Sequence, residues 1–184
     1  NNLLAVLVLG LGGFAFGEEE KNQYLEGEIG GVVVCKGSEE KCNVSSLELI
    51  KEFEGFRGEA YQCQAGKWTI GYGHTKNVEE GYRITEGEAE NILKEDLKKY
   101  EGAISRNVKS PLTPEQYNSL TSFVYNIGIG AFEESTLLKK INDRDYIGAG
   151  NEFDRWVKAN GKVSKGLEKR RAREKEMFLK YLPK

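Results

Sequence analysis

Residues 54–75 read EGFRGEAYQCQAGKWTIGYGHT, a stretch in which one structural pattern of the chain gives way to another. Ahead of it, Ser45 and Glu48 have the capping-box spacing, in which a hydroxyl and a carboxylate each satisfy a free amide at a helix start. We therefore expect a short helix over residues 46–54. Glycines inside the stretch then break that helix. Residues that favour strands follow: Tyr61, Trp68, Ile70, Tyr72 and, further on, Tyr82. They predict a small antiparallel sheet whose first turn is Gln64–Gly66.

Helix signals dominate the chain after residue 84. Thr85 and Glu88 repeat the capping box and open a long amphipathic pattern. Thr113 starts another, with Pro114 at the first helical position, where a missing amide costs nothing. Further helices are expected over residues 114–127, 133–142, 146–158 and 166–181. The sequence therefore predicts an α+β fold, in which a long helix joins a small sheet lobe to a larger helical lobe.

The first 45 residues differ in composition from the rest. Residues 3–16 carry no charge, but this apolar run is short of the roughly 20 residues that a membrane-spanning helix needs. We expect residues 1–17 to be a signal peptide or a weak membrane anchor, with a buried helix of the domain as the alternative. Residues 18–45 are rich in Glu and Gly and are expected to form a linker or regulatory segment. This leaves residues 46–184 as one folded domain.

Charge is small overall but unevenly distributed. The formal net charge is −2, yet residues 158–184 hold ten basic and three acidic residues. Such a local excess suits an anionic polymer, although a solvated helix face fits equally well. We expect no nucleic-acid partner.

Three cysteines, Cys35, Cys42 and Cys63, cannot all pair within the chain, so at least one thiol stays free or pairs outside it. The chain has one histidine, and it lacks the paired Cys and His clusters that tetrahedral zinc coordination requires. We expect neither a metal ion nor an organic cofactor.

Three polar residues of the quoted stretch carry a resemblance to a known family. Glu54 is followed by eight residues and then Cys63, and five further residues separate Cys63 from Thr69. This spacing resembles that of the phage-type lysozymes, glycoside hydrolase family 24, which include the T-even phage lysozymes. In that family the middle residue is Asp or Cys. The resemblance continues to about residue 182 through four segments: Phe123–Asn126, Ser135–Leu138, Arg155–Trp156 and Gly166–Arg171.

The resemblance implies a lysozyme-like fold, with residues 46–184 as the catalytic domain and a cleft between its two lobes. It also implies an endolysin, a muramidase that hydrolyses the β-1,4 bond between N-acetylmuramic acid and N-acetylglucosamine in bacterial peptidoglycan and so lyses the cell. Two alternatives stay open. One is a hydrolase of chitin-like polymers. The other is a cell-wall-binding module whose catalytic set has drifted, since Cys63 replaces the Asp of many relatives.

Glycoside cleavage gives each member of the implied catalytic set a role. One acid protonates the leaving oxygen, and a second group handles water or the oxocarbenium carbon on the other face of the sugar. Glu54, at a helix end, is expected to be the general acid, with partial burial favouring its protonated form. Cys63 would activate water as a thiolate, which gives inversion, while direct attack on carbon with retention stays open. Thr69 is expected to hold that water.

The same resemblance implies supporting roles for residues elsewhere in the chain. Arg170 matches the family's arginine that approaches the catalytic Glu, and we expect it to orient Glu54. His74 matches a structural histidine whose partner on the long helix is Asp96. Two further positions match residues that line the cleft, an aromatic ring and an amide that suit sugar rings and N-acetyl groups: Tyr72 and Asn126.

Export would expose the cysteines to an oxidising environment. We expect the protein to be exported to the bacterial periplasm or secreted, and to be a monomer. Transient tethering to the inner membrane through residues 3–16 before release would resemble the signal-anchor-release endolysins. We expect Cys35 to pair with Cys42 there and to leave Cys63 free, whereas pairing of either with Cys63 would cage the site.

Overall fold

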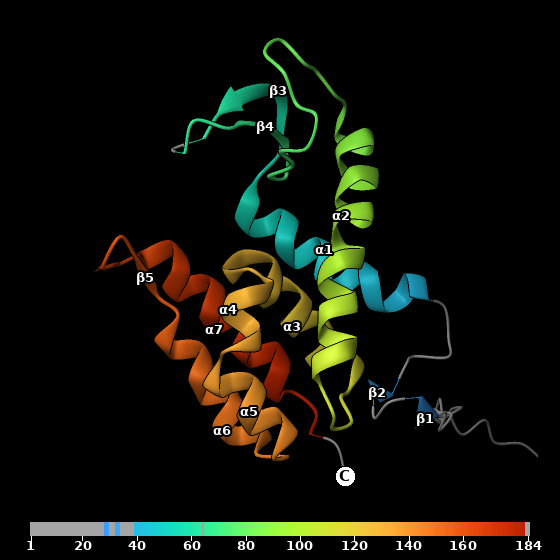
Figure 1. The fold of residues 1–184 in the computed structure, drawn as a ribbon, viewed down its shortest axis with the longest axis vertical. Coiled ribbons are helices and arrows are strands. Elements are labelled where there is room, and N and C mark those ends of the chain that lie inside the picture. The colour runs from blue at the N-terminus through green and yellow to red at the C-terminus, as the bar shows by residue number, and fades with distance from the viewer. Residues whose placement is uncertain (1–27, 30–31, 34–38, 64, 183–184) are drawn as a thin grey trace, which may run out of the picture.

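A single long helix, α2 (Glu86–Asn107), sets the shape of the molecule. In the computed structural model a two-stranded sheet lies at one end of α2, and most of the other helices gather beside its other end (Figure 1). The predicted α+β fold, with two lobes joined by a long helix, is confirmed. The structure describes four parts of the chain: residues 28–29, 32–33, 39–63 and 65–182.

The other elements are short. The helices are α1 (Glu39–Glu54), α3 (Pro114–Ile127), α4 (Ile129–Glu133), α5 (Thr136–Asn142), α6 (Tyr146–Glu152), the 3-10 helix η1 (Phe153–Arg155) and α7 (Lys165–Leu179). The strands form three antiparallel pairs: β1 (Glu28–Ile29) with β2 (Val32–Val33), β3 (Arg57–Gln62) with β4 (Trp68–Gly71), and β5 (Lys158–Ala159) with β6 (Lys162–Val163).

The hairpin of β3 and β4 is the predicted antiparallel sheet: Tyr61, Trp68 and Ile70 lie in its strands, whereas Tyr72 and Tyr82 lie outside them. Tyr61 pairs with Thr69, and Gln62 pairs with Trp68, so the last residues of β3 lie opposite the first residues of β4. The turn between them includes Gly66, whose φ of 73° is a left-handed conformation that glycine adopts without strain. The hairpin therefore brings the residues after β3 next to the start of β4.

Local capping signals placed the starts of α2 and α3 correctly. At the start of α2, Thr85 and Glu88 form the predicted reciprocal capping box. The start of α3 has the same arrangement between Thr113 and Gln116, with Pro114 at the first helical position. Both start signals are confirmed. They are reliable because a capping box depends only on residues within one turn of helix.

Two predicted helices have different bounds in the structure. The first begins at Glu39 rather than at 46, so Ser45 lies inside α1. Good helix formers such as Glu and Lys precede Ser45 and continue the helix backward. The helix predicted over residues 133–142 is instead two helices, α4 and α5, because the Ser135 side chain accepts a hydrogen bond from the Leu138 amide and starts a new helix.

The prediction of a helix over residues 146–158 is wrong at its end. Helix α6 stops at Glu152, and after η1 the chain forms the β5–β6 hairpin. Asn160 and Gly161 make its turn with φ of 50° and 76°. An Asn-Gly pair with both φ values positive is the commonest short hairpin turn, because its twist matches that of the strands. This turn signal outweighed the helical pattern around it.

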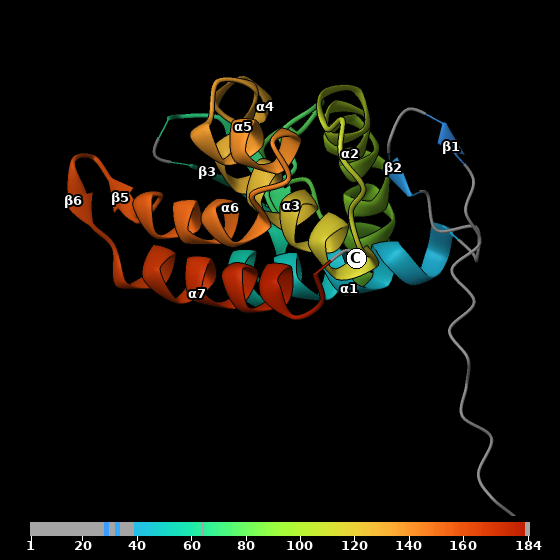
Figure 2. The same cartoon turned by 90° about the horizontal axis from the view of Figure 1, so that it is seen from below.

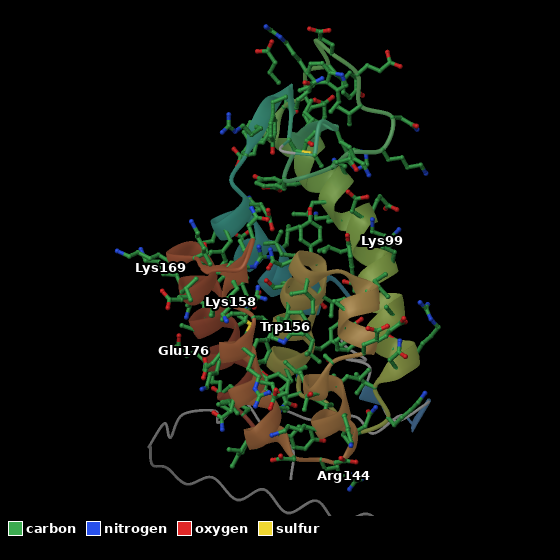
Figure 3. The ribbon with its side chains drawn as sticks, turned by 60° about the vertical axis from the view of Figure 1, so that its left-hand side comes forward. Lys99, Arg144, Trp156, Lys158, Lys169 and Glu176 are labelled. Carbon is green, nitrogen blue, oxygen red and sulfur yellow. The ribbon has the colours of Figure 1, made fainter. Side chains whose placement is uncertain are left out.

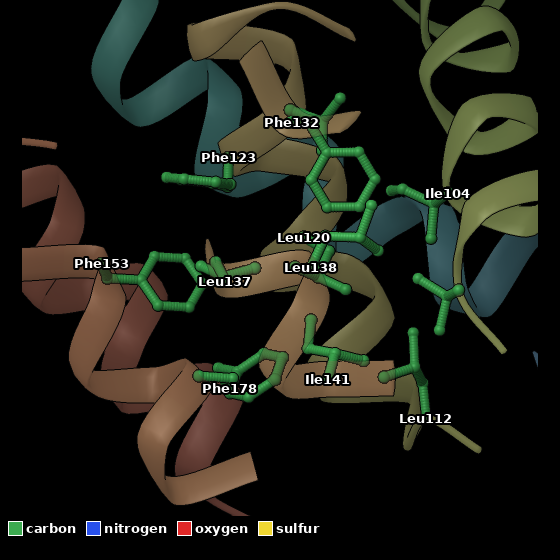
Figure 4. Packing of buried hydrophobic residues seen from close by; sticks show 13 residues of the cluster. Ile104, Leu112, Leu120, Phe123, Phe132, Leu137, Leu138, Ile141, Phe153 and Phe178 are labelled. Carbon is green, nitrogen blue, oxygen red and sulfur yellow. The ribbon is translucent and has the colours of Figure 1, made fainter. Parts of the chain in front are cut away.

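Two hydrophobic cores hold the lobes. The larger lies among α3, α5, α6 and α7 and includes Phe123, Phe153 and Phe178 (Figure 4). The smaller joins α1, α2 and the residue after β4, and Tyr100 packs against both. Seen from below, α1 and α7 both lie along one edge of the molecule beside α3 (Figure 2). The C-terminal end of α1 therefore meets α3 and α7 on one side and β3 on the other.

Several predictions fall on the part of the chain that the structure leaves undescribed. Residues 1–17 and most of residues 18–45 belong to it, and so does Cys35, the expected partner of Cys42. Of the helices in the described residues, none has both the length and the apolar character to span a membrane. The expected signal peptide or anchor, the linker and the disulfide stay predictions.

Candidate active site

Glu54 is the last residue of α1, and its carboxylate is held by Arg170 of α7. Arg170 Nη1 donates to Glu54 Oε1 over 2.6 Å, and the two residues are 116 positions apart in the sequence. The Arg170 side chain is 4% exposed and the Glu54 side chain 27%. The buried arginine thus fixes a carboxylate that still reaches the surface. The structure brings together the pair that the sequence predicted.

Arg170 is itself held by a carboxylate that sequence reasoning missed. Its Nε donates to Glu174 Oε1 over 3.1 Å, and its Nη2 donates to the Ser122 carbonyl over 3.2 Å. The Ser122 hydroxyl donates to the same Glu174 oxygen over 2.7 Å. The signal was present in the sequence, because Glu174 stands four positions after Arg170, the spacing at which two helical side chains meet.

Arg171 completes this buried cluster and reaches Asn126. Arg171 Nη2 donates to Asn126 Oδ1 over 3.0 Å, and its Nε lies 2.8 Å from Glu174 Oε2. Burial lowers the pKa of Arg171 to about 10 and raises the pKa of Glu174, while the two guanidiniums oppose the second shift. Asn126 is exposed, so the buried Arg171 holds an amide that remains at the surface.

Cys63 follows β3 directly and is a free, half-buried thiol. Its backbone amide donates to the Lys67 carbonyl over 2.9 Å, which closes the turn. Hydrogen bonding from the Lys67 backbone, and then from that of Ala65, lowers the pKa of the Cys63 thiol, and the Thr69 hydroxyl adds to this shift. The turn thus favours the thiolate.

Thr69 lies on β4 with its side chain turned toward the hairpin turn. The residue is 4% exposed, and its hydroxyl donates to the Lys67 carbonyl over 3.1 Å. Among the described residues no hydrogen bond or ion pair joins Glu54 to either Cys63 or Thr69. The acid is positioned by the helical lobe and the thiol by the hairpin, so a ligand would have to contact both.

Comparisons with known proteins identify the family of the chain. The sequence profile of the phage lysozyme family matches residues 51–174. The chain belongs to the phage lysozyme family. An endolysin of Acyrthosiphon pisum secondary endosymbiont phage 1 is 51% identical over 136 residues, which are 72% of this chain and 93% of that protein.

Two further relatives extend the comparison. A SAR-endolysin of Escherichia phage Mu is 45% identical over 111 residues, which are 60% of this chain and 65% of the Mu protein. The solved structure of the muramidase domain of SpmX from Asticaccaulis excentricus is 42% identical. It superposes with a TM-score of 0.70 and covers 73% of this chain and 95% of that one. The lysozyme-like fold is confirmed, and the chain is a glycoside hydrolase by family.

Tyr72 occupies a different place in this lysozyme from the predicted cleft surface. The residue is 3% exposed and belongs to the smaller core, where its hydroxyl donates to Glu86 Oε1 over 2.9 Å. Its carbonyl accepts a hydrogen bond from the Tyr125 hydroxyl over 2.6 Å. The expectation of a sugar-contacting ring at Tyr72 is therefore corrected, because burial of its large apolar surface in the core is more favourable than exposure.

His74 and Asp96 meet as the resemblance implied. His74 Nδ1 lies 2.7 Å from Asp96 Oδ2, and its Nε2 lies 2.9 Å from the Lys76 carbonyl. Both ring nitrogens are thus engaged: the Nδ1 contact ties the segment after β4 to α2, and the Nε2 contact is local. This geometry fits a structural histidine, and that role stays a proposal.

The basic stretch at the C-terminal end is not a uniform solvated face. Arg170 and Arg171 are buried in the cluster around Glu174. Lys158 of β5 and Lys169 of α7 are exposed on the α7 side of the lysozyme, away from Lys99 on α2 (Figure 3). In the described part of the chain no group of three or more His, Cys, Asp or Glu residues is placed to hold a metal ion.

Proposed function

We propose that this lysozyme is an endolysin that hydrolyses the β-1,4 bond between N-acetylmuramic acid and N-acetylglucosamine in bacterial peptidoglycan and so lyses the cell. The contact between Arg170 and Glu54 carries this proposal. This contact holds the Glu54 carboxylate at the junction of the two lobes. Glu54 ends α1, and the β3–β4 hairpin begins shortly after it (Figure 1). Relatives named endolysin and muramidase domain support the substrate class.

The chemistry of the proposal divides between the two lobes. Glu54 would give its proton to the oxygen of the leaving sugar as the bond to the anomeric carbon breaks. The Cys63 thiolate would accept a proton from a water molecule, whose oxygen then bonds to the same carbon from the opposite face. The lowered pKa of Cys63 supports this role, because it increases the thiolate fraction near neutral pH.

Thr69 would support the thiolate in this scheme. Its hydroxyl is directed to the turn that carries Cys63, where it contributes to the lowered pKa of the thiol and can also contact the attacking water. Inversion at the anomeric carbon is the expected outcome. Direct attack of the sulfur on carbon would retain the configuration, and the anomer of the first product, read by NMR, separates the two.

We also propose export of the lysozyme to the periplasm or the medium, with transient tethering to the inner membrane through residues 3–16 and action as a monomer. The similarity of the chain to a protein named SAR-endolysin, from phage Mu, supports a tethered form. Cell fractionation of the full chain and of a chain lacking residues 3–16 tests the proposal. The full chain should sediment with membranes before lysis, and equal distribution of the two chains would contradict tethering.

The decisive experiment for the activity compares wild type with Glu54→Gln on purified peptidoglycan sacculi. Wild type should release fragments whose new reducing sugar is N-acetylmuramic acid, whereas Glu54→Gln should fall by at least about 10²-fold because it cannot donate the proton. Reducing N-acetylglucosamine would contradict the assigned bond. Cleavage of chitin but not of sacculi would favour the chitin-like alternative, and sacculus binding by the wild type without any cleavage would favour the wall-binding module.

A further inference from the structure

Glu174 is a fully buried carboxylate whose two oxygens are both engaged by charged or polar groups. Oε1 accepts from the Ser122 hydroxyl over 2.7 Å, from Arg170 Nε over 3.1 Å and from Arg171 Nη2 over 3.3 Å. Oε2 lies 2.8 Å from Arg171 Nε. Burying a carboxylate without exposed surface is costly unless charged partners surround it. The buried Glu174 therefore requires Arg170 and Arg171 to stay in contact with it.

These contacts leave one corner of the Arg170 guanidinium for Glu54. Nε is used by Glu174, and Nη2 is used by the carbonyl and hydroxyl oxygens of Ser122. Only Nη1 points to Glu54. Because a guanidinium is planar and rigid, fixing two of its nitrogens also fixes the direction of the third. The guanidinium additionally lies over the Phe53 ring, 5.5 Å from its centre.

The charges of the cluster change when Glu54 carries the proton that a general acid needs. With Glu54 ionised, two carboxylates face two guanidiniums, Arg170 and Arg171. With Glu54 protonated, Glu174 is the remaining carboxylate of the cluster. Tyr125 of α3 also acts on this region, but burial raises its pKa and keeps the phenol neutral. Glu174 therefore offsets part of the positive charge that the two guanidiniums place beside Glu54.

We propose that Glu174, together with Ser122, is a positioning residue for the acid: it aims Arg170 at Glu54 and balances the arginine charges so that Glu54 can be protonated during the reaction. The proposal rests on the proposed role of Glu54 as general acid. It assigns to Glu174 an effect on activity through Arg170, without contact to the substrate.

The test compares Glu174→Gln with Glu168→Gln, an exposed carboxylate near the start of the same helix. Turnover and KM on soluble peptidoglycan fragments are measured across the pH range in which wild type is active, with circular dichroism to check folding. Glu174→Gln should lower kcat by about tenfold and move the upper pH limit of kcat downward, with KM nearly unchanged. Glu168→Gln should match wild type.

Ser122→Ala is the second variant, since Glu174→Gln removes a buried charge and can fail to fold. It keeps the Glu174 charge and removes one hydrogen bond to the carboxylate, so a loss of about threefold in kcat is expected, with KM and the upper pH limit of kcat nearly unchanged. A folded Glu174→Gln protein with a wild-type pH profile overturns the proposal, and where that variant does not fold, a Ser122→Ala protein with the kcat of wild type overturns it. An active Glu54→Gln protein would instead overturn the proposed role of Glu54 as the general acid. The failure of the positioning proposal and the failure of the proposed function can therefore be told apart.

Discussion

The two sides of the candidate active site are built in different ways. On the sheet side, the environment of Cys63 comes from the next six residues of the chain, Ala65, Lys67 and Thr69 among them. On the helical side, Glu54 depends on Arg170, which lies 116 positions away and is held in turn by Ser122 and Glu174. A local turn is enough to lower the pKa of the Cys63 thiol, whereas the Glu54 carboxylate is positioned only when the helices of the core have packed together. Substitutions on the two sides should therefore have different consequences for stability.

Arg170→Ala should produce the largest effect, because it removes the cation between two carboxylates. Glu174 would stay buried beside one guanidinium fewer, and we expect a loss of about 3–5 kcal/mol in the free energy of unfolding, together with most of the activity. Urea denaturation measures the first and sacculus digestion the second. Arg173→Ala, which breaks only the exposed pair with Glu176, should cost about 1 kcal/mol or less. Equal losses for the two variants would contradict the view that the helical side depends on buried charge.

Cys63→Ala should affect activity almost alone. The lost base or nucleophile predicts a fall of about 10²–10⁴-fold in the rate of sacculus digestion. The side chain is only half buried, so the free energy of unfolding should stay close to that of the wild type. Cys63→Asp is the matched variant, because the family resemblance places Asp at this position in many relatives, and it should restore most of the rate. An alanine variant as fast as wild type would remove Cys63 from the mechanism.

Tyr125→Phe tests the contact between the two sides. The hydroxyl of Tyr125, on α3, donates to the carbonyl of Tyr72 in the sheet lobe, and its loss leaves that carbonyl without this donor. We expect a decrease of about 1–2 kcal/mol in the free energy of unfolding, measured by urea denaturation. Tyr82→Phe, at an exposed ring, is the control and should be neutral. If both variants are neutral, the lobes do not depend on this bond.

Thr69→Val should give the smallest effect and should act through the thiol. Thr69 contributes to the lowered pKa of Cys63 after the backbone of Lys67 and Ala65, so its removal should raise that pKa. A lowered pKa favours the thiolate above it, and the variant should therefore need a higher pH for the same rate of alkylation by iodoacetamide. Sacculus digestion should fall by about two- to tenfold. An unchanged alkylation profile, with Thr75→Val as control, would show that the hydroxyl does not reach the sulfur.

Most of the fold was readable from short-range signals, and its errors were also local. The capping boxes at Thr85 and Thr113 marked helix starts correctly because such a box involves only one turn of backbone. The same spacing at Ser45 did not, since upstream residues extend α1 through it. Asn160-Gly161 was a strong hairpin signal that the surrounding helical pattern concealed.

The site divides in the same way. The spacing of Glu54, Cys63 and Thr69 carries the family resemblance that predicts them as the catalytic set, which stays a prediction. The resemblance also assigned Arg170 to Glu54, a contact that the structure contains. Sequence reasoning placed Tyr72 at the cleft because its ring suits a sugar, while the structure buries that ring in the smaller core. It also missed Glu174, although its spacing of four from Arg170 was a signal, because the spacing does not show that the pair is buried.

By itself, the sequence determined the elements that depend on neighbouring residues: the β3–β4 hairpin, the capped starts of α2 and α3, and the turn that favours the Cys63 thiolate. Backbone hydrogen bonds and turn conformations involve residues a few positions apart, so a short stretch of sequence is enough to predict them. Only the tertiary structure decided that Arg170 would be buried, with Glu174 on one side and Glu54 on the other. Burial depends on which helices pack together, and that packing alone makes the charges of distant residues act on one carboxyl.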